Sequence, residues 1–246
     1  MIRRTALVLT ALTALSIPVT AMAESGHGKA HWGYSGAEGF QHWGDLSAEF
    51  HACKDGMAQS PIDIREYNAA DLPALKPSYH KGNLEVFNNG HTIQVNTGDS
   101  GSLSVDGKTY KLLQFHFHTP SEHYVDGAPY PMEVHFVHKA GDGTLGVIGV
   151  MMQLGAHNAA IDAIWRATQA SGGHASLSAA DLLPSNLDYY KYVGSLTTPP
   201  CSEGVQWHVA KNAIEISAAQ LHAFQALFSV NARPVQPQNS RNVKGD

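Results

Sequence analysis

One run of alternating apolar and polar residues, Leu113-Gln114-Phe115-His116-Phe117-His118, constrains the fold more than any other part of the chain. Successive side chains of a β-strand point to opposite faces, so Gln114, His116 and His118 share one face. The leucine and the two phenylalanines between them share the other face, which is expected to pack in a core. The segment therefore predicts a strand with one apolar face and one face that carries two imidazoles.

A second segment, Glu133-Val134-His135-Phe136-Val137-His138, has the same character. Here Glu133, His135 and Val137 share a face, while His138 points to the opposite one. If the two strands pair, three imidazoles converge beside an amide and a carboxylate: His116, His118, His135, Gln114 and Glu133.

Three neutral imidazoles suit a borderline divalent metal, zinc above all. Three protein ligands leave one coordination position open, which is typical of a catalytic site. Each imidazole needs an acceptor for its second nitrogen, and the strand pattern places Gln114 and Glu133 to supply two. The alternative for such a pattern is a solvated polar face, but the third histidine and its nearby carboxylate favour a metal. His123 falls in the connection between the strands and is not expected to be a ligand, nor is His138.

Short apolar runs separated by turn signals predict a sheet. Asn88-Asn89-Gly90 and Asp106-Gly107 are hairpin signals. Residues 145–154 form a continuous apolar run, which is typical of a buried central strand. Further strands are expected at 83–87, 91–96, 102–105, 108–112, 113–118 and 132–138.

Few helices are expected. One is predicted over 158–169 and a short one between 178 and 184, and a third follows Ser217, which forms a possible capping box with Gln220. We therefore expect a mainly β (α+β) fold. It should be a single domain with a large, mostly antiparallel sheet and a few short peripheral helices.

The first 23 residues have the pattern of a secretory signal peptide. Arg3 and Arg4 precede an apolar run over 6–19, and Ala21-Met22-Ala23 offers a cleavage site. The run is shorter than the ~20 residues that span a bilayer, and residues 24–246 contain no further candidate span. The predicted product is therefore one exported domain, 24–246, in a periplasm or otherwise secreted.

Cysteine count and charge narrow the function further. Cys53 and Cys201 are the only cysteines, and in an exported protein such a pair favours one disulfide over two free thiols. The net charge is −5 with no basic patch, so nucleic acid is not an expected partner.

Glu122 lies four residues after His118, in the connection over 119–131. Its carboxylate could orient a hydroxyl donor near the metal, or it could be a solvated loop acid. The pattern His116-x-His118-x3-Glu122 also resembles the first motif of cupin-type metal oxygenases, in which Glu122 would bind iron or manganese directly. However, no second cupin motif is visible around 132–160.

Six segments together resemble an α-class carbonic anhydrase of the bacterial exported type. They are HWGY (31–34), QSPIDI (59–64), NNGH (88–91), QFHFHTPSEH (114–123), EVHFVH (133–138) and GSLTTPPCSEGVQW (194–207). The resemblance runs from His31 to about Arg241. It implies a twisted sheet of about ten strands, with the segment 233–241 threaded into a knotted topology. A non-catalytic module that only binds zinc remains the alternative, although all three zinc histidines are present.

The resemblance implies the reversible hydration of carbon dioxide to bicarbonate and a proton, by attack of a zinc-bound hydroxide. The zinc ligands are then His116, His118 and His135, supported by Gln114 and Glu133. Thr197 accepts a hydrogen bond from the hydroxide and donates its own proton to Glu122, because a carboxylate can only accept. The implied partners are the small molecules CO2, water and bicarbonate, and the protein is expected to be a monomer or homodimer.

Residues for substrate and proton transfer follow from the same resemblance. The apolar substrate wall comprises Val137, Val147, Leu196 and Trp207, with Thr198 placing substrate or bicarbonate. His91 is the proton shuttle, and the residues that order the relay water are Tyr34, Asn89 and Gln94. Cys53 and Cys201 occupy positions where exported members of the family pair cysteines.

Overall fold

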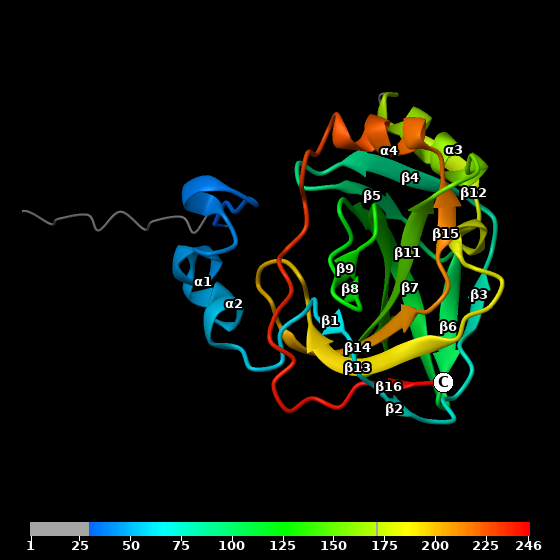
Figure 1. Ribbon diagram of the computed structural model, residues 1–246. Coiled ribbons are helices and arrows are strands. Elements are labelled where there is room, and N and C mark those ends of the chain that lie inside the picture. The colour runs from blue at the N-terminus through cyan, green and yellow to red at the C-terminus, as the bar shows by residue number, and fades with distance from the viewer. Residues whose placement is uncertain (1–29, 171) are drawn as a thin grey trace, which may run out of the picture. The chain divides into compact units, whose positions relative to one another are not determined.

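One sheet of thirteen strands organises the described chain, which comprises residues 30–170 and 172–246 of the computed structural model (Figure 1). The signal peptide expected at 1–23 lies outside these residues. Residues 31–246 form one unit. Neighbouring strands follow the order β12-β4-β5-β7-β10-β11-β14-β13-β16-β2, with β15 pairing with β11 and β3 with β6, which pairs with β7. A smaller sheet has the order β1-β8-β9.

The strands have these bounds. Those of the main sheet are β2 (Asn68–Ala69), β3 (Lys76–Tyr79), β4 (Gly82–Asn88), β5 (Ile93–Asn96), β6 (Gly101–Val105), β7 (Lys108–His118), β10 (Met132–Ala140), β11 (Leu145–Leu154), β12 (His174–Leu177), β13 (Tyr189–Ser195), β14 (Glu203–Ala210), β15 (Ile214–Ile216) and β16 (Lys244–Gly245). Those of the small sheet are β1 (Asp63–Ile64), β8 (Tyr124–Val125) and β9 (Ala128–Pro129). The mainly β fold class is thus confirmed, with more strands than the ten expected.

The two strands expected at 108–112 and 113–118 are one strand, β7. Its pairing with β10 shifts register between two neighbouring residues. Val137 pairs with Gln114, but His138 pairs with Leu112, so Leu113 has no partner on β10. Leu113 is 37% exposed, although the strand pattern places it on the apolar face. The irregularity is a β-bulge, which inserts one extra residue and re-aims the side chains around it.

Both hairpin signals are confirmed. Asp106 and Gly107 have φ of 52° and 72° between β6 and β7, as a tight turn with two left-handed residues requires. Gly90 has a φ of 90° in the connection between β4 and β5. That connection carries His91, so the turn sets where this side chain lies.

The two faces of the main sheet carry different cores. Phe115, Phe117 and Phe136 are fully buried on one face, in a core that includes residues of α3 (Ala159–Thr168) and α4 (Ala218–Gln225). Val137 and Trp207 belong to a second apolar cluster. The polar face of β7 and β10 is on the side of this second cluster, because the side chains alternate as expected.

The helices are short, as expected, and their caps follow the sequence signals. α3 begins after Asn158, whose side chain accepts hydrogen bonds from two backbone amides. Ser217 and Gln220 form the capping box of α4, and Ser178 and Asp181 form another for η3 (Ala179–Leu182). Four further short helices lie near the described N-terminus: η1 (Gly36–Glu38), α1 (Trp43–Leu46), η2 (Ala48–Phe50) and α2 (Ala52–Asp55). Among the described helices, none is both long and apolar enough to cross a membrane.

The C-terminal strand is inserted into the sheet. β16 pairs antiparallel with β13 on one side and parallel with β2 on the other. Its two neighbours come from opposite halves of the sequence, so the end of the chain passes between segments made early and late, as the expected threaded topology requires (Figure 1).

Candidate metal centre

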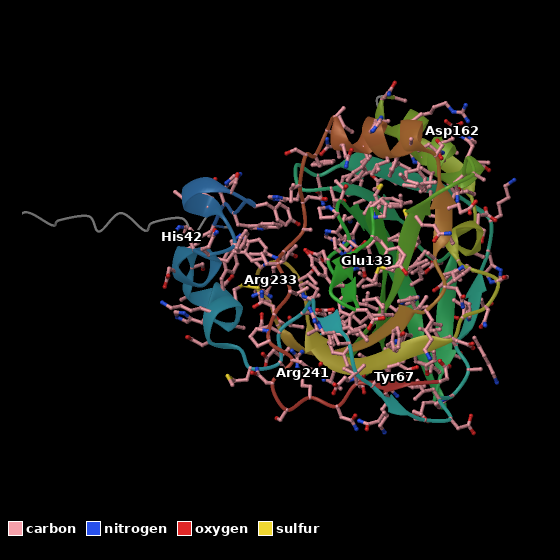
Figure 2. All side chains as sticks on the ribbon, in the orientation of Figure 1. His42, Tyr67, Glu133, Asp162, Arg233 and Arg241 are labelled. Carbon is pink, nitrogen blue, oxygen red and sulfur yellow. A yellow bond between two sulfur atoms is a disulfide. The ribbon has the colours of Figure 1, made fainter. Side chains whose placement is uncertain are left out.

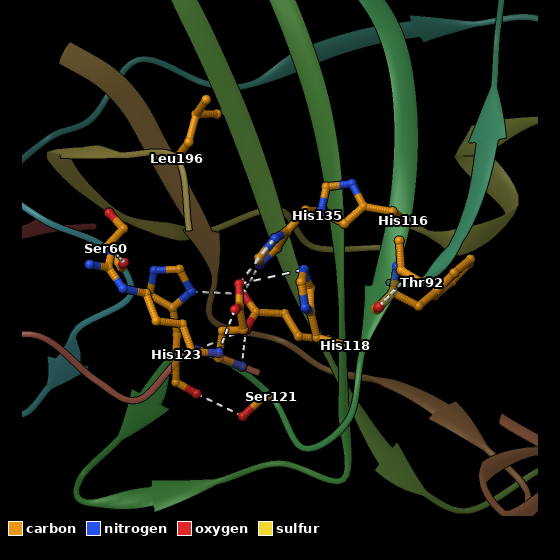
Figure 3. Close-up of polar contacts among 12 residues, drawn as sticks. Ser60, Thr92, His116, His118, Ser121, His123, His135 and Leu196 are labelled. Atoms are coloured by element: carbon orange, nitrogen blue, oxygen red, sulfur yellow. Dashed lines mark hydrogen bonds and ion pairs between the residues drawn. The ribbon is translucent and has the colours of Figure 1, made fainter. Parts of the chain in front are cut away.

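Strand register brings the three histidines together. His135 on β10 lies directly opposite His116 on β7, and Glu133 lies opposite His118. Figure 3 shows the three imidazoles converging from these strands. One nitrogen atom from each ring lies within 4.8 Å of the others, which is compatible with binding of a single metal ion.

The second nitrogen of each ring faces an acceptor. His116 Nδ1 lies 2.8 Å from Gln114 Oε1, and His118 Nδ1 donates to the main-chain carbonyl of Asn231 at 2.7 Å. His135 Nε2 lies 2.9 Å from Glu133 Oε1. These contacts leave His116 Nε2, His118 Nε2 and His135 Nδ1 to face one another. Among the described residues, His118 Nε2 and His135 Nε2 are both buried without a well-aligned hydrogen bond, although His135 Nε2 keeps its 2.9 Å contact with Glu133 Oε1. His118 Nε2 has no such carboxylate at short range and is an orphaned polar atom of the kind that a metal would satisfy.

Burial and charge tune the three rings differently. Burial, reinforced by repulsion from the other two imidazoles, lowers the pKa of His116 well below its usual range. Burial also lowers the pKa of His118, although the attraction of Glu122 opposes it. For His135 burial again acts downward, but the Glu133 carboxylate outweighs it and raises the pKa. A carboxylate at this position makes the imidazole a stronger electron donor to a metal.

Glu133 is held by four contacts. Its Oε2 accepts hydrogen bonds from the backbone amides of Glu122 and His123, both at 2.9 Å. Its Oε1 lies 2.8 Å from His123 Nδ1, in addition to the contact with His135. Burial raises the pKa of Glu133, but attraction to the two imidazoles outweighs it, so the net shift is well downward and the group is ionised.

His123 is a functional candidate that sequence reasoning set aside. It is fully buried, and its Nε2 lies 2.7 Å from the hydroxyl of Tyr192, which in turn lies 2.8 Å from Ser60 Oγ. His123 therefore links Glu133 to the hydroxyl of Tyr192 and is not one of the three converging imidazoles. A single histidine in a connecting loop carries no local signal for this role. His138 faces away, as expected, and lies 2.7 Å from the Tyr79 hydroxyl.

Gly149 on β11 lies opposite His135 and leaves room for the Glu133 carboxylate. A Cβ atom at this position would be 2.7 Å from Glu133 Oε1, closer than side chains approach one another. No pattern in the sequence marks this glycine, because its role depends on the side chain of a neighbouring strand.

Glu122 lies at the edge of the triad, but the expected hydrogen bond from Thr197 is not formed. Glu122 Oε1 accepts from the backbone amide of Arg233 at 2.8 Å. Its Oε2 is buried and has no hydrogen-bond partner in the part of the chain that the structure describes; it lies 3.5 Å from His118 Nε2 and 3.8 Å from His135 Nδ1. Thr197 is itself buried, just beyond the end of β13.

The four residues expected to form the substrate wall lie in or against one apolar cluster. Val137 on β10 pairs with Val147 on β11, which pairs with Trp207 on β14, so the three form a row across the sheet. Leu196 is partly buried and packs against this cluster. Val137 also pairs with Gln114, which places the row directly beside the triad. Thr198 is partly exposed, next to Thr197.

His91 is partly exposed and packs on the N-terminal segment. Its ring stacks on Trp32 with centroids 3.7 Å apart, and His31 lies 6.4 Å away. Burial, followed by repulsion from His31, lowers the pKa of His91. The two expected amide partners are joined, because Asn89 Nδ2 donates to Gln94 Oε1 at 3.2 Å. Tyr34 instead packs edge-on against Trp32 and Trp43.

The disulfide joins Cys53 to Cys201, which confirms the expected pairing. Arg233, labelled in Figure 2, lies next to it and is 3% exposed. Its guanidinium donates to the carbonyls of Cys53 and Ser60 and to Gln59 Oε1. Burial lowers the pKa of Arg233 to about 10, so the group remains a cation at neutral pH. One residue therefore binds the disulfide segment through its side chain and Glu122 through its main chain.

The fold and the site match a known family. Residues 38–245 match the family model described as eukaryotic-type carbonic anhydrase. The chain therefore belongs to the α-carbonic anhydrase family. It is an enzyme of the carbonic anhydrase class, which interconverts carbon dioxide and bicarbonate.

Individual relatives support this assignment. The chain is 45% identical over 247 residues to a carbonic anhydrase of Neisseria gonorrhoeae, with 98% of this chain and 96% of the relative covered. It is 43% identical to a carbonic anhydrase of Pectobacterium carotovorum, with 87% and 90% covered. The solved α-carbonic anhydrase of Thermovibrio ammonificans in complex with the inhibitor sulfanilamide has a TM-score of 0.84 at 48% identity, and the match covers 88% of this chain and 100% of that chain. A cupin-type oxygenase and a non-catalytic module are therefore not favoured.

Proposed function

We propose that the protein binds Zn²⁺ through His116, His118 and His135 and uses it to hydrate carbon dioxide reversibly. The observation that carries the proposal is the orientation of the three rings. Each has one nitrogen facing an acceptor and one facing the other two rings. Three imidazoles with fixed tautomers are the donor set that a catalytic zinc ion takes. When bound, zinc lowers the pKa of a coordinated water to about 7, a value known from carbonic anhydrase itself.

Carbon dioxide is small and apolar, so it needs an apolar surface beside the triad. The row of Val137, Val147 and Trp207 is suited to provide one, with Leu196 packed against it. The two valines and Leu196 carry no hydrogen-bonding group, and the indole N–H of Trp207 already donates to the Ser195 carbonyl at 2.9 Å. None of the four side chains would therefore hold water in place of the substrate. Thr198, which is partly exposed at the edge of this surface, would place the more polar bicarbonate.

Thr197 and Glu122 would orient the attacking water. The unpartnered Oε2 of Glu122 is an acceptor that needs a donor, and a threonine hydroxyl can supply it. Once the Thr197 proton is committed to Glu122, the Thr197 oxygen can only accept, and it would take the one proton that remains on the water after deprotonation to hydroxide. The hydroxide would then direct a lone pair, rather than a proton, at the carbon of the substrate.

His91 would carry the released proton to solvent. Partial exposure lets its ring exchange protons with buffer. A free imidazole titrates close to neutral pH, and burial followed by repulsion from His31 lowers the pKa of His91 from that value. Asn89 and Gln94 are joined by a hydrogen bond, and Gln94 lies opposite His116 in the sheet. Together with Tyr34, these polar groups would order water between the metal centre and His91.

The protein is proposed to act outside the cytoplasm, most readily in a periplasm. The basic and apolar pattern of residues 1–23 is that of a signal peptide, and the Cys53–Cys201 disulfide fits an oxidising compartment. N-terminal sequencing of the protein recovered from a periplasmic extract tests this proposal. An N-terminus at Met1 in a cytosolic fraction would contradict it.

Metal content and stopped-flow CO2 hydration, with and without an aromatic sulfonamide, test the activity and the metal together. We expect one zinc per chain and hydration that the sulfonamide inhibits. His116→Ala should lose both the zinc and nearly all activity. Zinc without hydration would instead indicate a binding module, and retention of both by His116→Ala would refute the ligand assignment.

A second variant tests the shuttle. His91→Ala should slow turnover in weak buffer, and added imidazole should restore it. The matched control is His157→Ala, which removes an exposed histidine in the connection between β11 and α3. An unaffected rate in weak buffer would remove His91 from this role.

A further inference from the structure

Asn231 lies where the metal-binding strand β7 and the shuttle-bearing turn meet. It belongs to the segment that follows α4, and it is 1% exposed. Its main-chain carbonyl accepts the hydrogen bond from His118 Nδ1 at 2.7 Å. Its side chain reaches in another direction and bonds the turn itself, so a single residue contacts both parts of the proposed machinery.

The carboxamide of Asn231 uses its oxygen and its nitrogen fully. Oδ1 accepts from the backbone amide of Thr119 at 2.8 Å. Nδ2 donates to the carbonyl of Phe117 at 2.9 Å and to the carbonyl of His91 at 3.0 Å. An amide nitrogen has two protons, so both are committed. Rotating the amide by 180° would oppose oxygen to two carbonyls and nitrogen to an N–H, which fixes its orientation.

Among the described residues, two other contacts restrain the turn that carries His91 from outside: the His91 ring stacks on Trp32, and the neighbouring Thr92 bonds β7. Asn89 Oδ1 accepts from the amides of His91 and Thr92, but these bonds lie within the turn. The Thr92 hydroxyl donates to the Phe117 carbonyl at 2.5 Å and accepts from the Phe117 amide at 3.1 Å, so it fixes the residue after His91 on β7. The hydrogen bond from Asn231 acts on the main chain of His91 itself. It connects that carbonyl to the same residue that orients the metal ligand His118.

We propose that Asn231 is a positioning residue for proton transfer: its side chain holds the His91 turn at a fixed separation from the metal centre. Catalysis depends steeply on the placement of reacting groups, and a misplacement of ~1 Å can cost about 100-fold in rate. This inference rests on the proposed shuttle role of His91 and adds the residue that sets its position.

Asn231→Ala separates the two functions of the residue, because the main-chain carbonyl that receives His118 is retained. We expect kcat in weak buffer to fall about tenfold, while kcat/KM and zinc affinity from chelator competition stay within about twofold. Imidazole should restore kcat. In the double variant His91→Ala/Asn231→Ala, the loss should be no greater than in His91→Ala alone, because both changes act on one step.

Two further measurements keep the proposal falsifiable. Histidine NMR spectra of the zinc-free protein should show an altered or broadened His91 ring signal in Asn231→Ala, a readout that does not require activity. Asn158→Ala is the matched control for lost stability, because it removes the cap of α3 at a site outside the proposed machinery. Asn158→Ala should lower Tm without changing KM. If Asn231→Ala does not fold, Asn231→Ser takes its place, because a hydroxyl can still accept from Thr119.

The outcomes are distinct. A parallel fall of kcat and kcat/KM, a loss of zinc, or an unchanged kcat in weak buffer would each overturn the role of Asn231. Should His91→Ala leave the buffer dependence unchanged, the shuttle itself is refuted and the inference with it. If kcat in weak buffer falls in His91→Ala but not in Asn231→Ala, only the role of Asn231 is refuted.

Discussion

Gly149→Ala should weaken zinc binding although neither glycine nor alanine has a side chain that can bind a metal. The new Cβ would lie 2.7 Å from Glu133 Oε1. Ordinary contact needs ~3.5 Å, so the two atoms must separate by roughly 0.8 Å. The carboxylate cannot simply turn away, because it holds His123 Nδ1 at 2.8 Å and His135 Nε2 at 2.9 Å. The displacement is therefore passed to the ring of His135.

The magnitude follows from the role of such carboxylates. Disturbing the hydrogen-bond partner of a metal-binding histidine typically costs 10–100-fold in affinity, or about 1.4–2.7 kcal/mol. Competition with a chromophoric chelator measures the zinc Kd directly, and Tm of the zinc-free protein reports the cost to the fold. We expect the Kd to rise by about that factor while the zinc-free protein stays folded.

Gly146→Ala is the matched control on the same strand. Gly146 lies three residues before Gly149, so its Cβ would point to the other face of β11. There it would meet the Tyr110 ring at 3.3 Å. It should lower Tm without changing the zinc Kd. The reasoning is refuted if Gly149→Ala binds zinc as tightly as the parent protein, or if both variants weaken binding equally.

Three other predictions concern acid, reduction and the Thr197 hydroxyl. Burial lowers the pKa of His138 to about 4 and of His208 to about 3, so between pH ~6.5 and pH 5 only the unfolded state takes up protons at these residues. The free energy of unfolding from urea titrations should therefore fall by up to ~4 kcal/mol between pH 7 and pH 5, and a flat profile would contradict this. Reducing the Cys53–Cys201 bond, which closes a loop of 148 residues, should lower the free energy of unfolding by up to ~5 kcal/mol, and an unchanged Tm in reductant would contradict it. Thr197→Val should retain zinc but lose ~100-fold in kcat/KM by stopped flow, and full activity would exclude the hydroxyl from the reaction.

Local patterns predicted the parts of the site that neighbouring strands build. Alternation in β7 and β10 placed His116, His118 and His135 on one face, because side-chain direction depends only on position along a strand. Turn and cap signals were also reliable, because they too depend only on residues close together in the sequence, as the positive φ of Asp106 in the turn Asp106-Gly107 shows. The bulge at Leu113 was not predicted, because it depends on how two strands align rather than on either alone.

The residues that sequence reasoning missed act through partners far along the chain. Asn231 accepts from His118 across 113 positions, and Arg233 reaches Cys53 across 180. A buried polar side chain must find a partner, but the sequence does not state which one. The resemblance to a known family identified Thr197 and His91 where periodicity could not, and their roles remain to be tested by the variants above.

The position of β16 has a consequence for how the protein is made. Lys244 pairs with Asn68, which the ribosome adds 176 residues earlier. At roughly 5–20 residues per second, the interval between them is about 10–35 s. Throughout that time β2 lacks this partner, and once β13 has emerged its outer edge is also unpaired. Exposed strand edges pair with other chains, so molecules that are translated or translocated only in part are open to pairing with one another along the outer edge of β13.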